Sequence, residues 1–85
     1  MDEQKVYIKC SIKEGLFSTE SVVTISAVDG EMSFVIDENL IRDNNQVEAQ
    51  LVRESGDESV VLMPTGSMEN GYPWASVSKS QLISA

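Results

Sequence analysis

Hydrophobic and polar residues alternate with a period of two along most of this chain, a pattern typical of half-buried β-strands rather than of helices. The run "KVYIKCSI", residues 5–12, alternates over eight positions, and "SVVTISAV", residues 21–28, is rich in β-branched residues. The other segments with a strand pattern are residues 31–36, 46–54, 58–63 and 72–83. We expect strands over these segments, with a short turn around Ser78–Gln81 inside the last one.

Turn signals separate the expected strands. Asp29-Gly30 lies between two alternating runs and predicts a hairpin with a type I′ turn, which needs positive φ at both central positions. "SGD", residues 55–57, predicts a second tight turn. Between these turns the pattern breaks at residues 37–45, where Asp37 is expected to cap a single helical turn. Pro64 marks the end of a strand, because proline removes a ladder donor.

These elements predict an all-β fold, with residues 1–85 as one domain. Five or six short, mostly antiparallel strands indicate a small barrel or sandwich, SH3-like in size and strand count. The acidic-aromatic motif and paired tryptophans of peptide-binding SH3 domains are absent, so their proline-peptide function does not carry over. The expected core positions include Val6, Ile8, Cys10, Ile12, Val23, Ile25, Ala27, Met32, Phe34, Ile36, Leu40, Ile41, Val47, Ala49 and Leu51.

The charge balance bears on the class of partner. Six basic residues stand against 14 acidic ones, for a net charge of −8 with no histidine. This charge argues against nucleic acid and against anionic membranes as partners, because both are bound mainly through basic residues. A single cysteine, Cys10, and the lack of a long apolar run favour a cytoplasmic location.

Lys5, Lys9 and Lys13 form the one local exception, since they hold half of the basic charge within nine residues. If residues 5–13 form one strand, all three lie on the same face. The simpler interpretation is a solvated face that pairs with acidic neighbours across the sheet. A small anion-binding stripe is the alternative.

Enzymatic chemistry has little support, and we predict no catalytic residue and no cofactor. Without histidine, Ser-His-Asp and Cys-His mechanisms are impossible. "SVSK", Ser76 to Lys79, matches a Ser-x-x-Lys spacing, but that motif needs a helix and here lies in a segment with a strand pattern. Cys10 lies on the apolar face of its strand, where a thiol behaves as a small hydrophobe.

Metal binding has one candidate segment, the acidic loop of residues 37–48. Asp37, Asn39, Asn45 and Glu48 match four positions of a calcium-binding EF-hand loop. Arg42 stands where that loop requires glycine, and the flanking segments have strand patterns. We therefore predict no metal ligand, and a cation-binding or small-ligand role for this loop remains the alternative function.

The stretch "SMENGYPWAS", residues 67–76, combines large apolar residues with an Asn-Gly turn signal. Period two places Tyr72 and Trp74 on the same face. Because the chain has only five aromatic residues, the core or its rim is the favoured place for Trp74. Met68 and Tyr72 are expected to be exposed near the tip. If the protein has a contact surface, Met68, Tyr72 and Trp74 are its candidate residues, since these residue types are enriched in interfaces.

The sequence thus favours a non-enzymatic protein-interaction module whose acidic surface selects a basic partner. A second copy of the chain is the other possible partner, with Val22 and Val28, opposite the core face of their strand, as a dimer seam or as residues under a loop. A structural subunit of a larger assembly is a further alternative.

Overall fold

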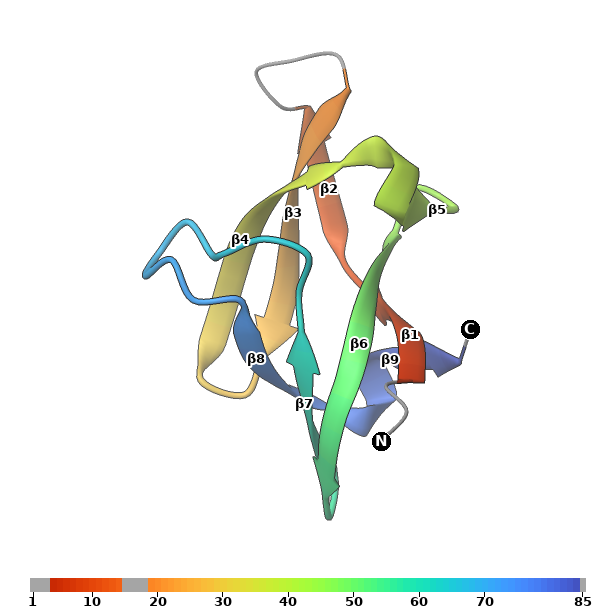
Figure 1. Ribbon diagram of the computed structural model, residues 1–85, viewed down its shortest axis with the longest axis vertical. Coiled ribbons are helices and arrows are strands. Elements are labelled where there is room, and N and C mark those ends of the chain that lie inside the picture. The colour runs from red at the N-terminus through yellow and green to blue at the C-terminus, as the bar shows by residue number, and fades with distance from the viewer. Residues whose placement is uncertain (1–3, 15–18, 85) are drawn as a thin grey trace.

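Two antiparallel sheets build the fold, as the computed structural model of residues 4–14 and 19–84 shows (Figure 1). The larger sheet has the strand order β8-β7-β6-β1-β9, with β5 beside β6. Its strands are β1 (Gln4–Lys9), β5 (Ile41–Arg42), β6 (Gln46–Ser55), β7 (Glu58–Leu62), β8 (Trp74–Ser78) and β9 (Leu82–Ser84). The smaller sheet has the order β2-β3-β4, from β2 (Ser11–Glu14), β3 (Glu20–Ala27) and β4 (Gly30–Asp37). The predicted all-β, antiparallel class is confirmed, and the two sheets do not close into a barrel.

The β3–β4 hairpin forms where it was predicted, but its turn is placed one residue earlier. Ala27 pairs with Gly30, so the two central residues are Val28 and Asp29. Asp29 has no positive φ; instead Gly30, the first residue of β4, takes φ +128°. A type I′ turn centred on Asp29-Gly30 is therefore not formed. The second predicted turn is present, since Ser55 pairs with Glu58 and Gly56 has φ +61°.

The alternating run of residues 5–13 does not form one strand, because the chain passes from one sheet to the other at Cys10. The Cys10 backbone N–H donates to the Asn45 carbonyl at 2.9 Å, between the end of β1 and the start of β2. Lys5, Lys9 and Lys13 are all exposed. Lys5 lies 3.6 Å from the Glu48 carboxylate on the neighbouring β6, as the cross-strand pairing interpretation expected.

The segment after β4 folds as predicted. A 3₁₀ turn, η1 (Glu38–Leu40), follows Asp37, whose side chain accepts a hydrogen bond from the Asn39 backbone N–H at 2.9 Å. Leu40 and Ile41 pack against the core. A second 3₁₀ turn, η2 (Lys79–Gln81), lies where the turn around Ser78–Gln81 was expected.

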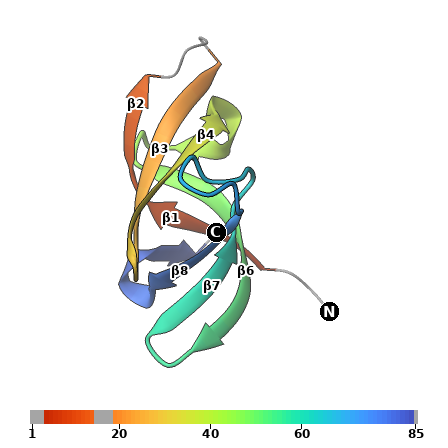
Figure 2. The same ribbon diagram turned by 90° about the vertical axis from the view of Figure 1, so that its left-hand side faces the viewer.

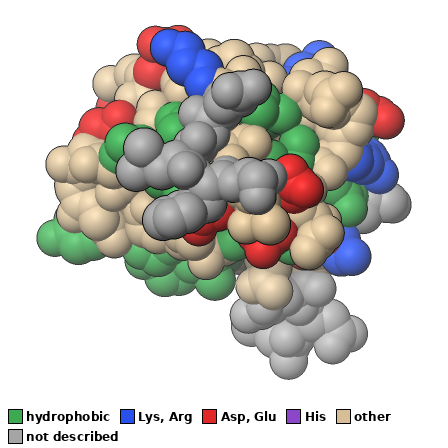
Figure 3. Space-filling model, turned by 90° about the horizontal axis from the view of Figure 1, so that it is seen from above, with side chains coloured by type: hydrophobic (Ala, Val, Ile, Leu, Met, Phe, Trp, Pro, Cys, Tyr) green, Lys and Arg blue, Asp and Glu red, His purple; other side chains and the backbone are tan. Residues whose placement is uncertain are grey.

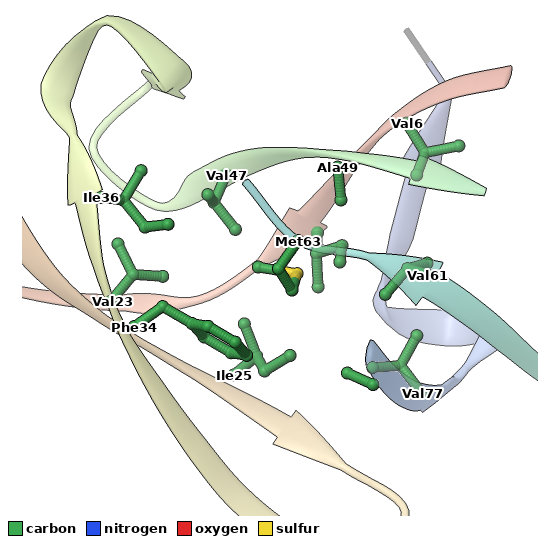
Figure 4. Close-up of a cluster of buried hydrophobic side chains, with 12 residues drawn as sticks. Val6, Val23, Ile25, Phe34, Ile36, Val47, Ala49, Val61, Met63 and Val77 are labelled. Atoms are coloured by element: carbon green, nitrogen blue, oxygen red, sulfur yellow. The ribbon is translucent and has the colours of Figure 1, made fainter. Parts of the chain in front are cut away.

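The core lies between the two sheets and follows the period of two (Figure 4). Each long strand contributes alternate apolar side chains, and Phe34, the largest fully buried one, comes from β4. The buried apolar residues are Val6, Ile8, Val23, Ile25, Phe34, Ile36, Val47, Ala49, Val61, Met63, Ala75 and Val77. Of the expected core residues, Cys10, Ile12, Ala27, Met32, Leu40, Ile41 and Leu51 are only partly buried. In the part of the chain that the structure describes, no helix is long and apolar enough to cross a membrane.

Candidate partner-binding surface

The loop of residues 63–73, between β7 and β8, is held in shape by its own hydrogen bonds. The backbone N–H of Ser67 donates to the Tyr72 carbonyl at 2.9 Å, and that of Gly71 donates to the Ser67 carbonyl at 2.8 Å. The Asn70 side-chain oxygen accepts from the Ser67 hydroxyl at 2.6 Å and from the Tyr72 N–H at 2.9 Å. Gly71 has φ +79°, a conformation that favours glycine. The loop is therefore a defined structure that fixes where Met68 and Tyr72 emerge.

The same loop is bound to the outer edge of β4 (Figure 1 and Figure 2). The Met68 N–H donates to the Ser33 carbonyl at 2.8 Å, and the Ser33 N–H donates to a Glu69 carboxylate oxygen at 3.0 Å. The Thr65 hydroxyl donates to the Val35 carbonyl at 3.1 Å. These bonds place the loop beside the smaller sheet, although both of its ends belong to the larger one.

The three residues predicted for a contact surface are all exposed. Met68 is 61% exposed, Tyr72 65% and Trp74 50%. The expectation that Trp74 lies in the core or at its rim is therefore wrong. In β8 the side chains of Ala75 and Val77 are buried, so the strand period directs Trp74 outward. The alternation of buried and exposed positions along β8 decides the direction of Trp74, and the general preference of tryptophan for burial does not override it.

A fourth apolar side chain lies on the same side of the molecule. Val28, in the β3–β4 turn, is about half exposed, and its backbone N–H donates to the Ser76 carbonyl of β8 at 2.8 Å. Four of the five large exposed apolar side chains of the described residues thus come from this turn, the β7–β8 loop and the start of β8; the fifth is Val52 on β6. Val22, the other residue of the possible dimer seam, is partly buried.

A pocket of about 350 Å³ lies between the β3–β4 turn and the start of β8. Its apolar lining includes Trp74, and three acidic residues, Asp29, Glu31 and Glu69, line it as well. The full lining is Ala27, Asp29, Gly30, Glu31, Met32, Val60, Glu69, Asn70, Trp74, Ala75 and Ser76. Figure 3 shows hydrophobic side chains at the lower left of the view, the side on which the β7–β8 loop lies in Figure 1.

No lysine or arginine of the described residues lines this pocket. The two ion pairs found in residues 4–14 and 19–84 neutralise other carboxylates, those of Glu48 and Glu54. The pocket is therefore an acidic, partly apolar site whose negative charge has no counterpart within the described fold. Sequence reasoning missed this group of carboxylates, because Glu69 lies far along the chain from Asp29 and Glu31.

The other candidate residues are not brought together. In residues 37–48, Asp37 is used as a helix cap, and the Arg42 guanidinium lies 3.6 Å from the centre of the Tyr7 ring. Among the described residues, no group of three or more His, Cys, Asp or Glu side chains could hold a metal ion. Ser76 lies in β8, and Lys79 lies 3.5 Å from Glu54, so "SVSK" does not form one face of an α-helix.

Cys10 lies partly buried where β1 ends. Burial raises the pKa of its thiol from 9.0 to about 11, so the sulfur stays protonated well above neutral pH. A protonated thiol is a poor nucleophile.

Comparison of the chain with protein-family models, with curated proteins and with solved structures gives no match.

Proposed function

We propose that this protein is a non-enzymatic interaction module of SH3-like size, which binds a basic partner protein through Met68, Tyr72, Trp74 and the acidic pocket beside them. One observation carries the proposal: of the five large exposed apolar side chains among the described residues, Trp74 lines a pocket that also has three acidic residues and no basic one, and Val28, Met68 and Tyr72 come from the turn and loop that contribute to its lining. Exposed apolar groups that gather on one face are a common mark of an interaction site. We place the protein in the cytoplasm, because a single cysteine fits a reducing compartment better than a disulfide framework.

Charge argues for a basic partner over a second copy of the chain. In a two-fold dimer the same patch would face itself, so carboxylates would meet carboxylates. Each copy also carries a net charge of −8. A basic partner is attracted by the same carboxylates, which steer its approach and favour it over acidic proteins.

The test is affinity capture from extract of the native cells, with proteins identified by mass spectrometry. A Met68→Ser/Tyr72→Ser variant is compared with wild type, and Val52→Ser serves as the control for an exposed apolar residue outside the surface. We expect a basic protein bound by wild type and by the control, and lost by the double variant at unchanged melting temperature. Equal capture by all three proteins would contradict the proposed surface.

Light scattering tests the alternative partner. The proposal predicts a monomer mass that does not depend on concentration. A dimer that the Met68→Ser/Tyr72→Ser variant abolishes would assign this surface to self-association instead.

A further inference from the structure

The pocket is the gap left where the two sheets do not join. β4 ends the smaller sheet and β8 ends the larger one, and no ladder pairs them. The gap is closed at one end by the bond from Val28 N–H to the Ser76 carbonyl, and at the other by the bond from Met68 N–H to the Ser33 carbonyl. It is therefore a short opening flanked by two strand edges, too short to admit another full strand.

Backbone acceptors of both edges face this gap. In an antiparallel strand the N–H and C=O of one residue point to the same side, and alternate residues point the same way. The Ser76 carbonyl points away from β7 toward Val28, so the carbonyl of Trp74, two residues earlier, also points toward the gap. On β4 the N–H and carbonyl of Ser33 face away from β3, so those of Glu31 do too.

We infer that this pocket holds an arginine side chain of the basic partner protein. The pocket is lined by three acidic residues, Asp29, Glu31 and Glu69, and by Trp74. The strand pairing turns backbone carbonyls of its two flanking edges toward it as well. A guanidinium carries five N–H donors in a plane and no acceptor, so it suits a site rich in acceptors. Its plane also stacks on aromatic rings, which a lysine ammonium cannot do.

Size and charge support the same occupant. A volume of about 350 Å³ is at the lower end of the range for small-molecule sites, and suits one long side chain. The Glu69 carboxylate is already held in place by the Ser33 N–H, so one wall of the pocket is fixed before binding. Arginine is also one of the residue types enriched at the centres of interfaces.

This inference rests on the proposed function and is tested on the isolated protein by NMR titration. The probe is N-acetyl-arginine methylamide, and the indole N–H resonance of Trp74, the only tryptophan, reports binding. The citrulline derivative, a neutral molecule of nearly the same shape, and the lysine derivative are the controls. We expect a saturable shift with arginine, none with citrulline, and several-fold weaker binding of lysine.

Two matched variants locate the site. Glu69→Gln keeps an acceptor for the Ser33 N–H and removes the charge, so arginine binding should weaken about two- to fivefold, the effect of one partly exposed ion pair. Glu38→Gln, in η1 at the other end of β4, changes the net charge equally and should leave binding unchanged. Equal shifts with arginine and citrulline, or equal weakening by both variants, would overturn the inference.

The proposed function and the inference can fail separately. Partner capture that depends on Met68 and Tyr72, with no saturable arginine binding, would overturn the arginine pocket and leave the surface standing. Arginine binding in the pocket, with capture unaffected by the Met68→Ser/Tyr72→Ser variant, would keep the pocket and refute the proposed surface.

Discussion

Replacing Gly66 with alanine should distort the loop that presents Met68 and Tyr72. A Cβ atom at position 66 would lie 2.2 Å from the Gly71 carbonyl oxygen, whereas ordinary contacts begin at 3.4 Å. The φ of Gly66 is not in the left-handed region, so the expected effect comes from this contact and not from backbone strain. The atoms that the new Cβ would meet belong to the Gly71 backbone, and backbone atoms cannot rotate out of the way as the end of a flexible side chain can.

The expected loss of stability follows from the displacement of two backbone segments, those at Gly66 and Gly71. Separating the two backbone segments strains the bond from Gly71 N–H to the Ser67 carbonyl and that from Ser67 N–H to the Tyr72 carbonyl. Overpacking of this kind costs about 1–3 kcal/mol. The unfolding free energy of a domain of this size is about 4–13 kcal/mol, at about 0.05–0.15 kcal/mol per residue. The variant should therefore fold, with a Tm lower by about 4–8 °C for each kcal/mol lost.

The assay is urea denaturation together with an amide NMR spectrum. Gly56→Ala is the matched control, because its Cβ would meet no atom within 4 Å and its φ of +61° alone costs about 1–2 kcal/mol. Both variants should be destabilised, but only Gly66→Ala should shift the amide resonances of residues 67–72 and weaken partner capture. If the unfolding free energy of Gly66→Ala lies within about 0.5 kcal/mol of wild type and those resonances are unchanged, the predicted clash with Gly71 does not occur.

Three further predictions concern single features. Because Trp74 is half exposed, its fluorescence should be red-shifted and readily quenched by acrylamide. A blue-shifted emission that acrylamide quenches poorly would show instead that Trp74 is buried in the core. Since the folded pKa of Cys10 is about 11 and the unfolded value is 9.0, the folded state binds the thiol proton more tightly, and this stabilisation should be lost as the pH rises from 9 to 11. The urea midpoint should therefore fall less steeply with pH in Cys10→Ala than in wild type. An equal dependence of the midpoint on pH in both proteins would contradict the raised pKa of Cys10. Millimolar calcium should leave the Tm unchanged, because no three carboxylates of the described chain gather at residues 37–48; a raised Tm would favour the cation-binding alternative.

Local patterns predicted much of this fold because their physical causes are local. The β3–β4 hairpin, the Asp37 cap and the turn at Gly56 depend on residues within a few positions of one another. The described residues form nine strands where five or six were expected, for two reasons. The strands β5 and β9 have two and three residues, too few to show a period, and the run of residues 5–12 divides at Cys10 into β1 and β2.

The candidate site was predictable only in part. Met68 and Tyr72 were expected to be exposed because they flank a turn signal, and the structure confirms this. Trp74 was misplaced because its size was given more weight than the period of Ala75 and Val77. The pocket itself depends on bonds between segments far apart in the chain, such as that from Met68 to Ser33, which no local pattern reveals.

The central claim is that the surface of Met68, Tyr72 and Trp74 contacts a basic partner protein. The most direct test places a photocrosslinking phenylalanine analogue at position 72 and, in a separate control, at position 52, where Val52 is similarly exposed on β6. Irradiation of the native cells should join a basic protein to the chain from position 72 and not from position 52. Crosslinks of equal yield from both positions, or from position 52 alone, would contradict the central claim.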